Sequence, residues 1–395
     1  MKKISLFFLC LTFLTLIMSN CGPSQSLPSP IPSTQTPLPA TVTSVPPTQT
    51  PLPATVTSVP STQTPLPASA IHLSPSPTLL SPAGSVKMEN PQRYRVEYIA
   101  TVRNKGYALN RLVVYQPRPV EWDSQKSVTV EVISPTPSKE GVDPILGNGI
   151  YYWQVQELPK QGESLAFRLQ FTYMAYEIAT KIDPDEVRPY NQADPSYRLF
   201  TRAERYIESA DPKIIEVANQ IAAGEMNPYR LARKFYDYVI VTANYHLLGK
   251  GLLGAKTLIT TGQGECGDYA SLFVALSRAK GIPARPVVGY WALSGIEQTH
   301  VWAEFYLEGV GWIPVDPTVG QSQSRKPGKL DYYFGNMDNQ RVILNKGFNI
   351  QLDPPAPNNY VAPFLQVPLW WYWGASGDGN AMSIERTSWK VALIP

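Results

Sequence analysis

The residue best suited to chemistry in this sequence is Cys266, which lies in the run Gly-Glu-Cys-Gly-Asp. Glycines on either side of Gln263 predict a loop, and a helical pattern begins at Cys266 and ends at Gly281. A thiol at a helix N-terminus faces unpaired N–H groups and the positive end of the helix dipole. We therefore expect Cys266 to have a lowered pKa and to act as a nucleophile, whereas a structural cysteine usually sits among apolar neighbours.

A thiol nucleophile needs a base that titrates near neutral pH, and the chain holds three histidines, His72, His246 and His300. His300 lies in the segment 299–307, where apolar residues alternate with His300, Trp302 and Glu304. This period of two predicts a strand whose core face is apolar. His300 then lies on the opposite face, where it can meet another element.

Asp316 lies on the strand that is expected to return from this one. A turn at Gly309–Gly311 predicts a hairpin in which the numbers of opposed residues add to about 618. Because that sum is even, His300 and Asp316 fall on the same face, within about one ladder step of each other. A carboxylate there can hold the imidazole in one tautomer.

Several segments together resemble the core of the transglutaminase-like superfamily. They are Gly264–Ala270, Gly281–Arg285, His300–Glu304, Trp312–Thr318 and, after the core, Tyr333–Asn336. The resemblance covers roughly residues 200 to 350 and implies a papain-like arrangement with Cys266 as nucleophile, His300 as base and Asp316 as the residue that orients the base. The superfamily includes crosslinkers, deamidases, peptidases, amidases and inactive members, so the resemblance implies fold and triad more specifically than reaction.

The sequence departs from the animal transglutaminases at the oxyanion hole. Those enzymes supply one donor from an upstream tryptophan, but no Trp lies between Trp153 and Cys266 here. The N–H of Cys266 is a natural first donor. Asn244, Tyr245 and Gln263 remain open as the second.

The elements around these residues predict an α+β fold, with a β-sandwich followed by the papain-like domain. Alternating apolar residues near 94–102 and 165–173 indicate half-buried strands. Asp211-Pro212 and Asn227-Pro228 predict two helix starts. We expect a signal peptide at 1–20, a Pro/Thr/Ser-rich linker at 21–84, a sandwich at 85–190, the transglutaminase-like domain at 195–350 and a Pro- and aromatic-rich extension at 351–395. The aromatic residues of that extension favour packing over sugar binding.

The first residues resemble an export signal. Lys2 and Lys3 precede an apolar run that is too short to span a bilayer comfortably, and Met18-Ser-Asn-Cys21 resembles a bacterial lipobox. We expect Cys21 to be lipidated, and the repeated Pro-rich tract after it to tether the enzyme on the outer side of the cell membrane. An ordinary signal peptide with a chance cysteine is the alternative.

Composition narrows the classes of function. The formal charge of +3 over 395 residues does not favour nucleic acid binding. Since Cys10 leaves with the signal and Cys21 is lipidated, Cys266 remains as the single free thiol. We find no zinc-binding motif. The segment Gly249–Gly254 matches a dinucleotide-binding motif, but we interpret it as a mobile loop and expect no cofactor. The expected activity is hydrolysis of amides in protein or peptide substrates; an inactive cell-surface module that binds protein or glycan, or a true crosslinking transglutaminase, is the alternative.

Overall fold

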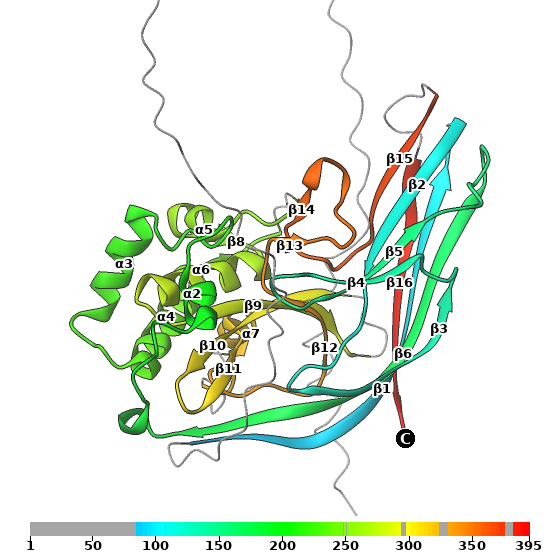
Figure 1. Ribbon diagram of the computed structural model, residues 1–395. Helices are drawn as coiled ribbons and strands as arrows, with labels where there is room; N and C mark the ends of the chain where they lie inside the picture. The colour runs from blue at the N-terminus through cyan, green and yellow to red at the C-terminus, as the bar shows by residue number, and fades with distance from the viewer. Residues whose placement is uncertain are drawn as a thin grey trace, which may run out of the picture. The chain divides into compact units, whose positions relative to one another are not determined.

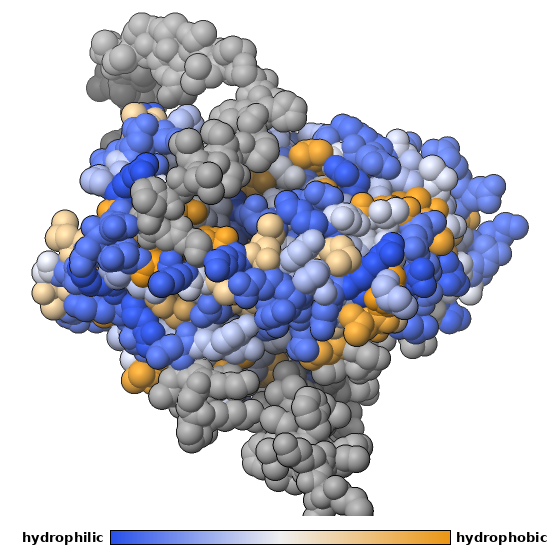
Figure 2. All heavy atoms as spheres, turned by 90° about the horizontal axis from the view of Figure 1, so that it is seen from below, coloured by the Kyte–Doolittle hydropathy of each residue, from blue (hydrophilic) through white to orange (hydrophobic). Residues whose placement is uncertain are grey.

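The computed structural model describes residues 84–395, apart from Tyr107, Leu248, Lys250, 294–297, 324–330 and 376–381. The expected signal peptide at 1–20, the lipidation site Cys21 and nearly all of the linker at 21–84 lie outside the described residues. All described residues belong to one compact unit, Ala68–Pro395. No helix among them is long and apolar enough to cross a membrane. On the face seen in Figure 2, hydrophobic residues form small separate groups among hydrophilic ones.

Two antiparallel sheets form the expected β-sandwich (Figure 1). One has the strand order β16 (Met382–Ile394), β1 (Gly84–Asn104), β6 (Ser164–Ile182) and β3 (Gln125–Ser134). The other has the order β15 (Leu369–Ala375), β2 (Ala108–Pro117), β5 (Gly149–Gln154) and β4 (Lys139–Val142). The alternation seen in the sequence is confirmed, because Tyr94, Val96 and Tyr98 are buried between the sheets while Arg95 is exposed.

The C-terminal residues return to the sandwich. β15 pairs with β2, and β16 pairs with β1 along most of its length. Trp389 is 2% exposed and stacks on Tyr290 with ring centroids 4.2 Å apart. The tryptophans of β15 are also partly buried against the core. These contacts support packing as the role of the C-terminal aromatic residues.

Another four-stranded antiparallel sheet lies in the predicted catalytic region. Its strands are ordered β11 (Gly311–Val315), β10 (Thr299–Leu307), β9 (Ala284–Trp291) and β12 (Arg341–Lys346). Two short strand pairs are also present: β7 (Asn244–Tyr245) pairs with β8 (Gln263–Gly264), and β13 (Ile350–Gln351) pairs with β14 (Val361–Ala362). The described residues also form the 3-10 helices η1 (Pro184–Glu186) and η2 (Pro357–Asn359).

Helices cover one face of this sheet, and the sandwich covers the other (Figure 1). They are α2 (Pro195–Thr201), α3 (Pro212–Ala222), α4 (Pro228–Thr242), α5 (Ala255–Thr261), α6 (Cys266–Ala279) and α7 (Pro317–Gln323). The predicted caps are confirmed: the side chain of Asp211 accepts from the N–H of Lys213, and that of Asn227 accepts from Tyr229. Phe273 of α6 and Phe305 of β10 meet in the core beneath the helices.

Candidate active site

Cys266 is the first residue of α6, as the sequence predicts. The chain reaches it through β8, where a side chain at Gly264 would approach the Cβ of Asp268 to 2.8 Å. Asp268 closes the start of the helix, because its Oδ2 accepts from the N–H of Glu265 at 3.0 Å. The N–H of Cys266 has no carbonyl partner within the helix, since the first turn of a helix lacks one. It is therefore placed to bind an oxyanion.

The glycine-rich loop at 249–254 is tied to this helix start. The N–H groups of Leu253 and Gly254 both donate to Oδ1 of Asp268 at 2.9 Å, and Gly249 N donates to Oε1 of Glu265 at 3.1 Å. The sequence suggested a mobile loop. Three of its described residues, Gly249, Leu253 and Gly254, are hydrogen-bonded to the two carboxylates that flank the thiol.

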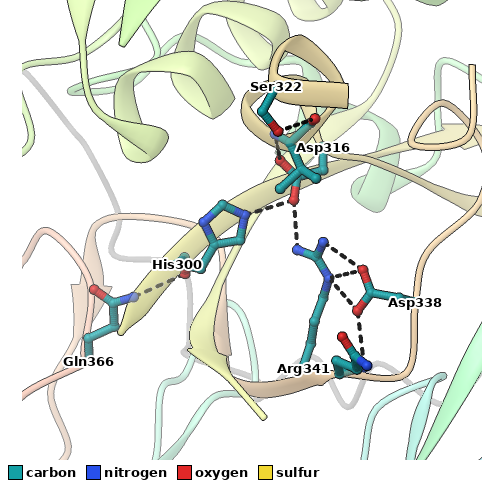
Figure 3. A network of polar contacts seen from close by, with 8 residues as sticks. His300, Asp316, Ser322, Asp338, Arg341 and Gln366 are labelled. Atoms are coloured by element: carbon teal, nitrogen blue, oxygen red, sulfur yellow. Dashed lines mark hydrogen bonds and ion pairs between the residues drawn. The ribbon is translucent and has the colours of Figure 1, made fainter. Parts of the chain in front are cut away.

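His300 lies on β10 in a buried aromatic frame. Its imidazole is stacked between Trp291, at 4.8 Å between ring centroids, and Trp302, at 6.0 Å. Nε2 of His300 lies 2.7 Å from Oδ2 of Asp316 (Figure 3). An ionised carboxylate can only accept a hydrogen bond, so Nε2 carries a proton, and in the neutral ring the lone pair then lies on Nδ1.

The carboxylate of Asp316 is fully buried and accepts three hydrogen bonds. Oδ2 accepts from His300 and from Nη1 of Arg341, both at 2.7 Å, and Oδ1 accepts from the N–H of Val319 at 3.0 Å. Burial alone would raise the pKa of Asp316, but the charges of His300 and Arg341 and these hydrogen bonds hold it well below its usual range. The carboxylate is therefore an anion at any working pH.

The thiol environment differs from the sequence-based expectation. Burial raises the pKa of Cys266 to about 12, and the nearby carboxylates of Asp316 and Glu265 add to the rise. Hydrogen bonding from the backbone N–H groups of Val301 and Gly267 opposes it only in part. The raised pKa is opposite in direction to the low pKa expected from the helix start, and it belongs to a residue that is partly buried. The contact with Val301 also places the sulfur beside the residue that follows His300.

Arg341 is the site residue that sequence reasoning missed. It opens β12, and its guanidinium bridges Asp316 and Asp338 (Figure 3). Its position relative to Asp316 follows from β12 pairing with β9, a contact between distant parts of the chain. No spacing in the sequence indicates that contact.

The three residues considered as a second oxyanion donor all lie near the start of α6. Asn244 and Tyr245 form β7, which pairs in parallel with Gln263 and Gly264 of β8. The side-chain amide of Asn244 donates to the carbonyl of Gly262 at 3.4 Å, and Tyr245 is 47% exposed. Within residues 84–395 as described, no group of three or more metal-binding side chains is present.

Comparison with known proteins agrees with this geometry. Residues 215–317 match the family model of the transglutaminase-like superfamily, and this range contains Cys266, His300 and Asp316. The chain therefore contains a transglutaminase-like domain. Members of this superfamily typically depend on a cysteine, which agrees with a thiol at the start of α6.

The proteins that resemble the chain include two curated relatives and a solved structure. An uncharacterized protein of Haemophilus influenzae is 29% identical over 209 residues, which cover 42% of this chain and 56% of the relative. A protein-glutamine gamma-glutamyltransferase of Pseudomonas aeruginosa is 37% identical over 78 residues, 17% of this chain and 12% of that protein. The chain thus spans about half of the first relative and a small part of the second.

The solved structure is that of a Cytophaga hutchinsonii protein provisionally named a cysteine protease. It has a TM-score of 0.54 at 18% identity and covers 78% of this chain and 93% of its own. That likeness confirms the α+β fold in which the transglutaminase-like domain follows a β-rich region.

Proposed function

We propose that the chain is an exported thiol enzyme that acts on amide bonds of protein or peptide substrates through a thioester at Cys266. The observation that carries the proposal is the 2.7 Å contact between His300 and Asp316, next to the helix start that holds the thiol. This contact leaves Nδ1 of a buried, oriented imidazole as the proton acceptor. A thiol, a base and a carboxylate held in this order are the parts that acyl transfer needs.

In the first half of the reaction, Sγ of Cys266 attacks the amide carbon while its proton passes to Nδ1 of His300. The base is needed in this step because the surroundings of Cys266 raise the pKa of its thiol. The N–H of Cys266 stabilises the oxyanion. When the C–N bond breaks, the leaving amine takes the proton from the imidazolium, and the acyl group remains on sulfur as a thioester.

In the second half, water gives a proton to Nδ1 of His300 and attacks the thioester, which releases a carboxylic acid and restores the thiol. We favour water over an amine as the acceptor. Trp291 and Trp302, the tryptophans nearest the base, are 8% and 3% exposed and stack on His300. Because their rings pack against the imidazole, these tryptophans orient His300 and are not available to shield an access path from water. The provisional protease name of the solved structure supports the same choice.

We also propose that the enzyme is anchored to the outer side of the cell membrane through a lipid on Cys21. The support is the charged and apolar start of the chain, the Cys21 that ends it and the Pro-rich tract beyond. A tether of this composition is extended and solvated, so it would let the enzyme reach protein or peptide in the cell envelope. This proposal requires no cofactor and no nucleic acid.

The deciding experiment offers a glutamine-bearing protein and a fluorescent primary amine to the purified protein, with Cys266→Ser as the control. Release of ammonia or cleavage of peptide bonds without amine incorporation supports hydrolysis. Incorporation that outpaces hydrolysis would instead make the chain a crosslinking transglutaminase, the activity named for the Pseudomonas relative. No reaction of any amide substrate would favour an inactive binding module.

A further inference from the structure

Arg341 is a buried cation in direct contact with the carboxylate of the proposed triad. Its side chain is 4% exposed, with Nη1 2.7 Å from Oδ2 of Asp316 and Nη2 3.0 Å from Oδ2 of Asp338. Asp316 is not exposed at all. A buried arginine of this kind is costly to desolvate unless its charge is matched, and here two carboxylates match it. Its position is therefore tightly defined.

The same aromatic rings hold Arg341 and His300. The guanidinium carbon lies 4.4 Å from the ring centroid of Trp291 and 5.0 Å from that of Trp302, and both rings also stack on the imidazole. Arg341 and His300 thus approach one carboxylate oxygen from within a single frame, as Figure 3 shows for the polar contacts. Movement of the guanidinium would change the packing and the hydrogen bonding of the imidazole together.

The sandwich fixes the segment that carries Arg341. The hydroxyl of Tyr173 on β6 donates to the carbonyl of Arg341 at 3.1 Å. The amide of Asn339 donates to the carbonyl of Asn90 on β1 at 2.7 Å. Further along, Gln125 of β3 bonds both the N–H and the carbonyl of Ile343. The guanidinium is therefore held against Asp316 by strands outside the transglutaminase-like domain.

From this geometry we propose that Arg341 is a positioning residue of the triad, which orients Asp316 and places a cation beside the imidazole of His300. The proposal rests on the proposed function of His300 as the base. A cation that shares Oδ2 with the imidazole disfavours the imidazolium, whereas the anion of Asp338 favours it. The two charges thus act on the imidazole with opposite signs, and neutral imidazole is the form that can take the proton of a thiol.

Other charged and titratable groups lie on the elements that pack around His300 or further along its strand. In the described part of the chain they are Cys266 and Glu265 at the start of α6, Asp316 before α7, and Tyr333, Asp338 and Arg341 beside Asp316. Further along β10 they are Glu304 with its partners Arg285 and Lys346. In the Glu304 cluster both cations are ion-paired with Glu304, and Asp123, 3.9 Å from Nζ of Lys346, supplies the second anion. Removing Arg341 and Asp338 one at a time therefore separates the effect of a cation on His300 from the effect of an anion.

The test is the imidazole pKa of His300 in the full-length protein, measured by NMR with histidine labelled in the ring. The chain has three histidines, so the signal is assigned by its loss in His300→Gln. In Arg341→Gln we expect the pKa to rise by about one pH unit, because the opposing cation is gone. In Asp338→Asn we expect it to fall, because an attracting anion is gone. Arg341→Lys should return it to within about half a unit of wild type, because the charge is kept.

The matched control is Arg278→Gln, which removes another buried arginine that is paired with Glu204. It should leave the pKa of His300 unchanged. If Arg341 and Asp338 only stabilised the fold, the pKa of His300 would stay unchanged in both Arg341→Gln and Asp338→Asn, or would shift in the same direction in both. Either result overturns the inference. If Arg341→Gln does not fold, the fall in Asp338→Asn still decides the matter. The titration needs no substrate, so a wild type that hydrolyses no amide would reject the proposed function without altering this result.

Discussion

Nε2 of His300 donates to Oδ2 of Asp316 over 2.7 Å, and in the neutral ring this contact leaves the lone pair on Nδ1. An asparagine at 316 could present either its oxygen or its NH₂ to the ring, so the tautomer would no longer be fixed. The contact therefore controls which nitrogen can act as the base.

We predict that Asp316→Asn lowers kcat/KM for amide hydrolysis by roughly three to four orders of magnitude. Initial rates with the best amide substrate check this. Asp338→Asn is the comparison, because Asp338 contacts Arg341 and lies one step further from the imidazole. Equal losses in the two variants would argue against tautomer control by Asp316.

The second prediction concerns the pH dependence of alkylation. Because burial raises the pKa of Cys266 to about 12, ionisation at neutral pH depends on His300. In His300→Gln, alkylation of Cys266 by iodoacetamide should be slower at pH 7. Its rate should increase about tenfold per pH unit up to pH 10, because the thiolate fraction does so below the pKa.

The rate is measured by mass spectrometry of the peptide that contains Cys266, so the other two cysteines do not interfere. Cys266→Ser gives the background. A plateau near pH 8.5 in His300→Gln would mean that the thiol is an ordinary one and that burial does not suppress its ionisation.

The third prediction concerns stability in acid. The pKa of Asp316 is lower in the folded chain than in the unfolded chain, so the unfolded state binds more protons as the pH falls. The contribution of Asp316 is complete above about pH 5 and decreases below it. The free energy of unfolding should therefore fall less steeply between pH 5 and pH 3 in Asp316→Asn than in wild type.

Urea unfolding at several pH values gives these slopes. Asp185→Asn, which removes a carboxylate that is 75% exposed, should keep the wild-type slope. A slope in Asp316→Asn as steep as that of wild type would contradict the assigned pKa.

The sequence predicted the parts of the site that depend on local patterns. The hairpin of β10 and β11 pairs Ala303 with Val315 and Phe305 with Ile313, which gives the expected sum of 618. His300 and Asp316 meet for that reason. The start of α6 at Cys266 followed from the glycines before it and the apolar spacing after it.

The parts that depend on distant contacts could not be predicted. Arg341 reaches Asp316 because β12 pairs with β9 and is bonded to the sandwich, and neither contact leaves a period in the sequence. The pKa of Cys266 depends on how much of the chain covers the thiol, while the helix start alone suggested the opposite sign. The return of β16 to β1 likewise joins the two ends of the described chain.

The fourth prediction concerns the anchor. If Cys21 is lipidated, Cys21→Ser should move the protein from the membrane fraction to the soluble fraction, because several acyl chains anchor firmly and none would remain. Cell fractionation with immunoblotting measures this, and Cys10→Ser is the matched control with no change expected. A Cys21→Ser protein that stays with the membrane would reject the lipid anchor.

The last prediction concerns Gln125, the sandwich residue that holds β12. Its Oε1 accepts from the N–H of Ile343 at 2.8 Å, and its Nε2 donates to the carbonyl of Ile343 at 3.1 Å. Gln125→Leu leaves both backbone groups buried without these partners. Each such loss costs about 1–3 kcal/mol, so we expect the free energy of unfolding to fall by roughly 2–4 kcal/mol.

The same change should also reach the active site. Ile343 lies on the strand that Arg341 opens, so loosening β12 lets the guanidinium move away from Asp316 and allows the imidazole pKa of His300 to rise. Gln170→Leu is the control, because Gln170 bonds Glu131 at the surface of the sandwich and should change neither quantity appreciably. Urea unfolding and the NMR titration of His300 measure the two effects. A Gln125→Leu protein that is destabilised but keeps the wild-type pKa would mean that the sandwich supports the fold of the domain without setting the position of Arg341.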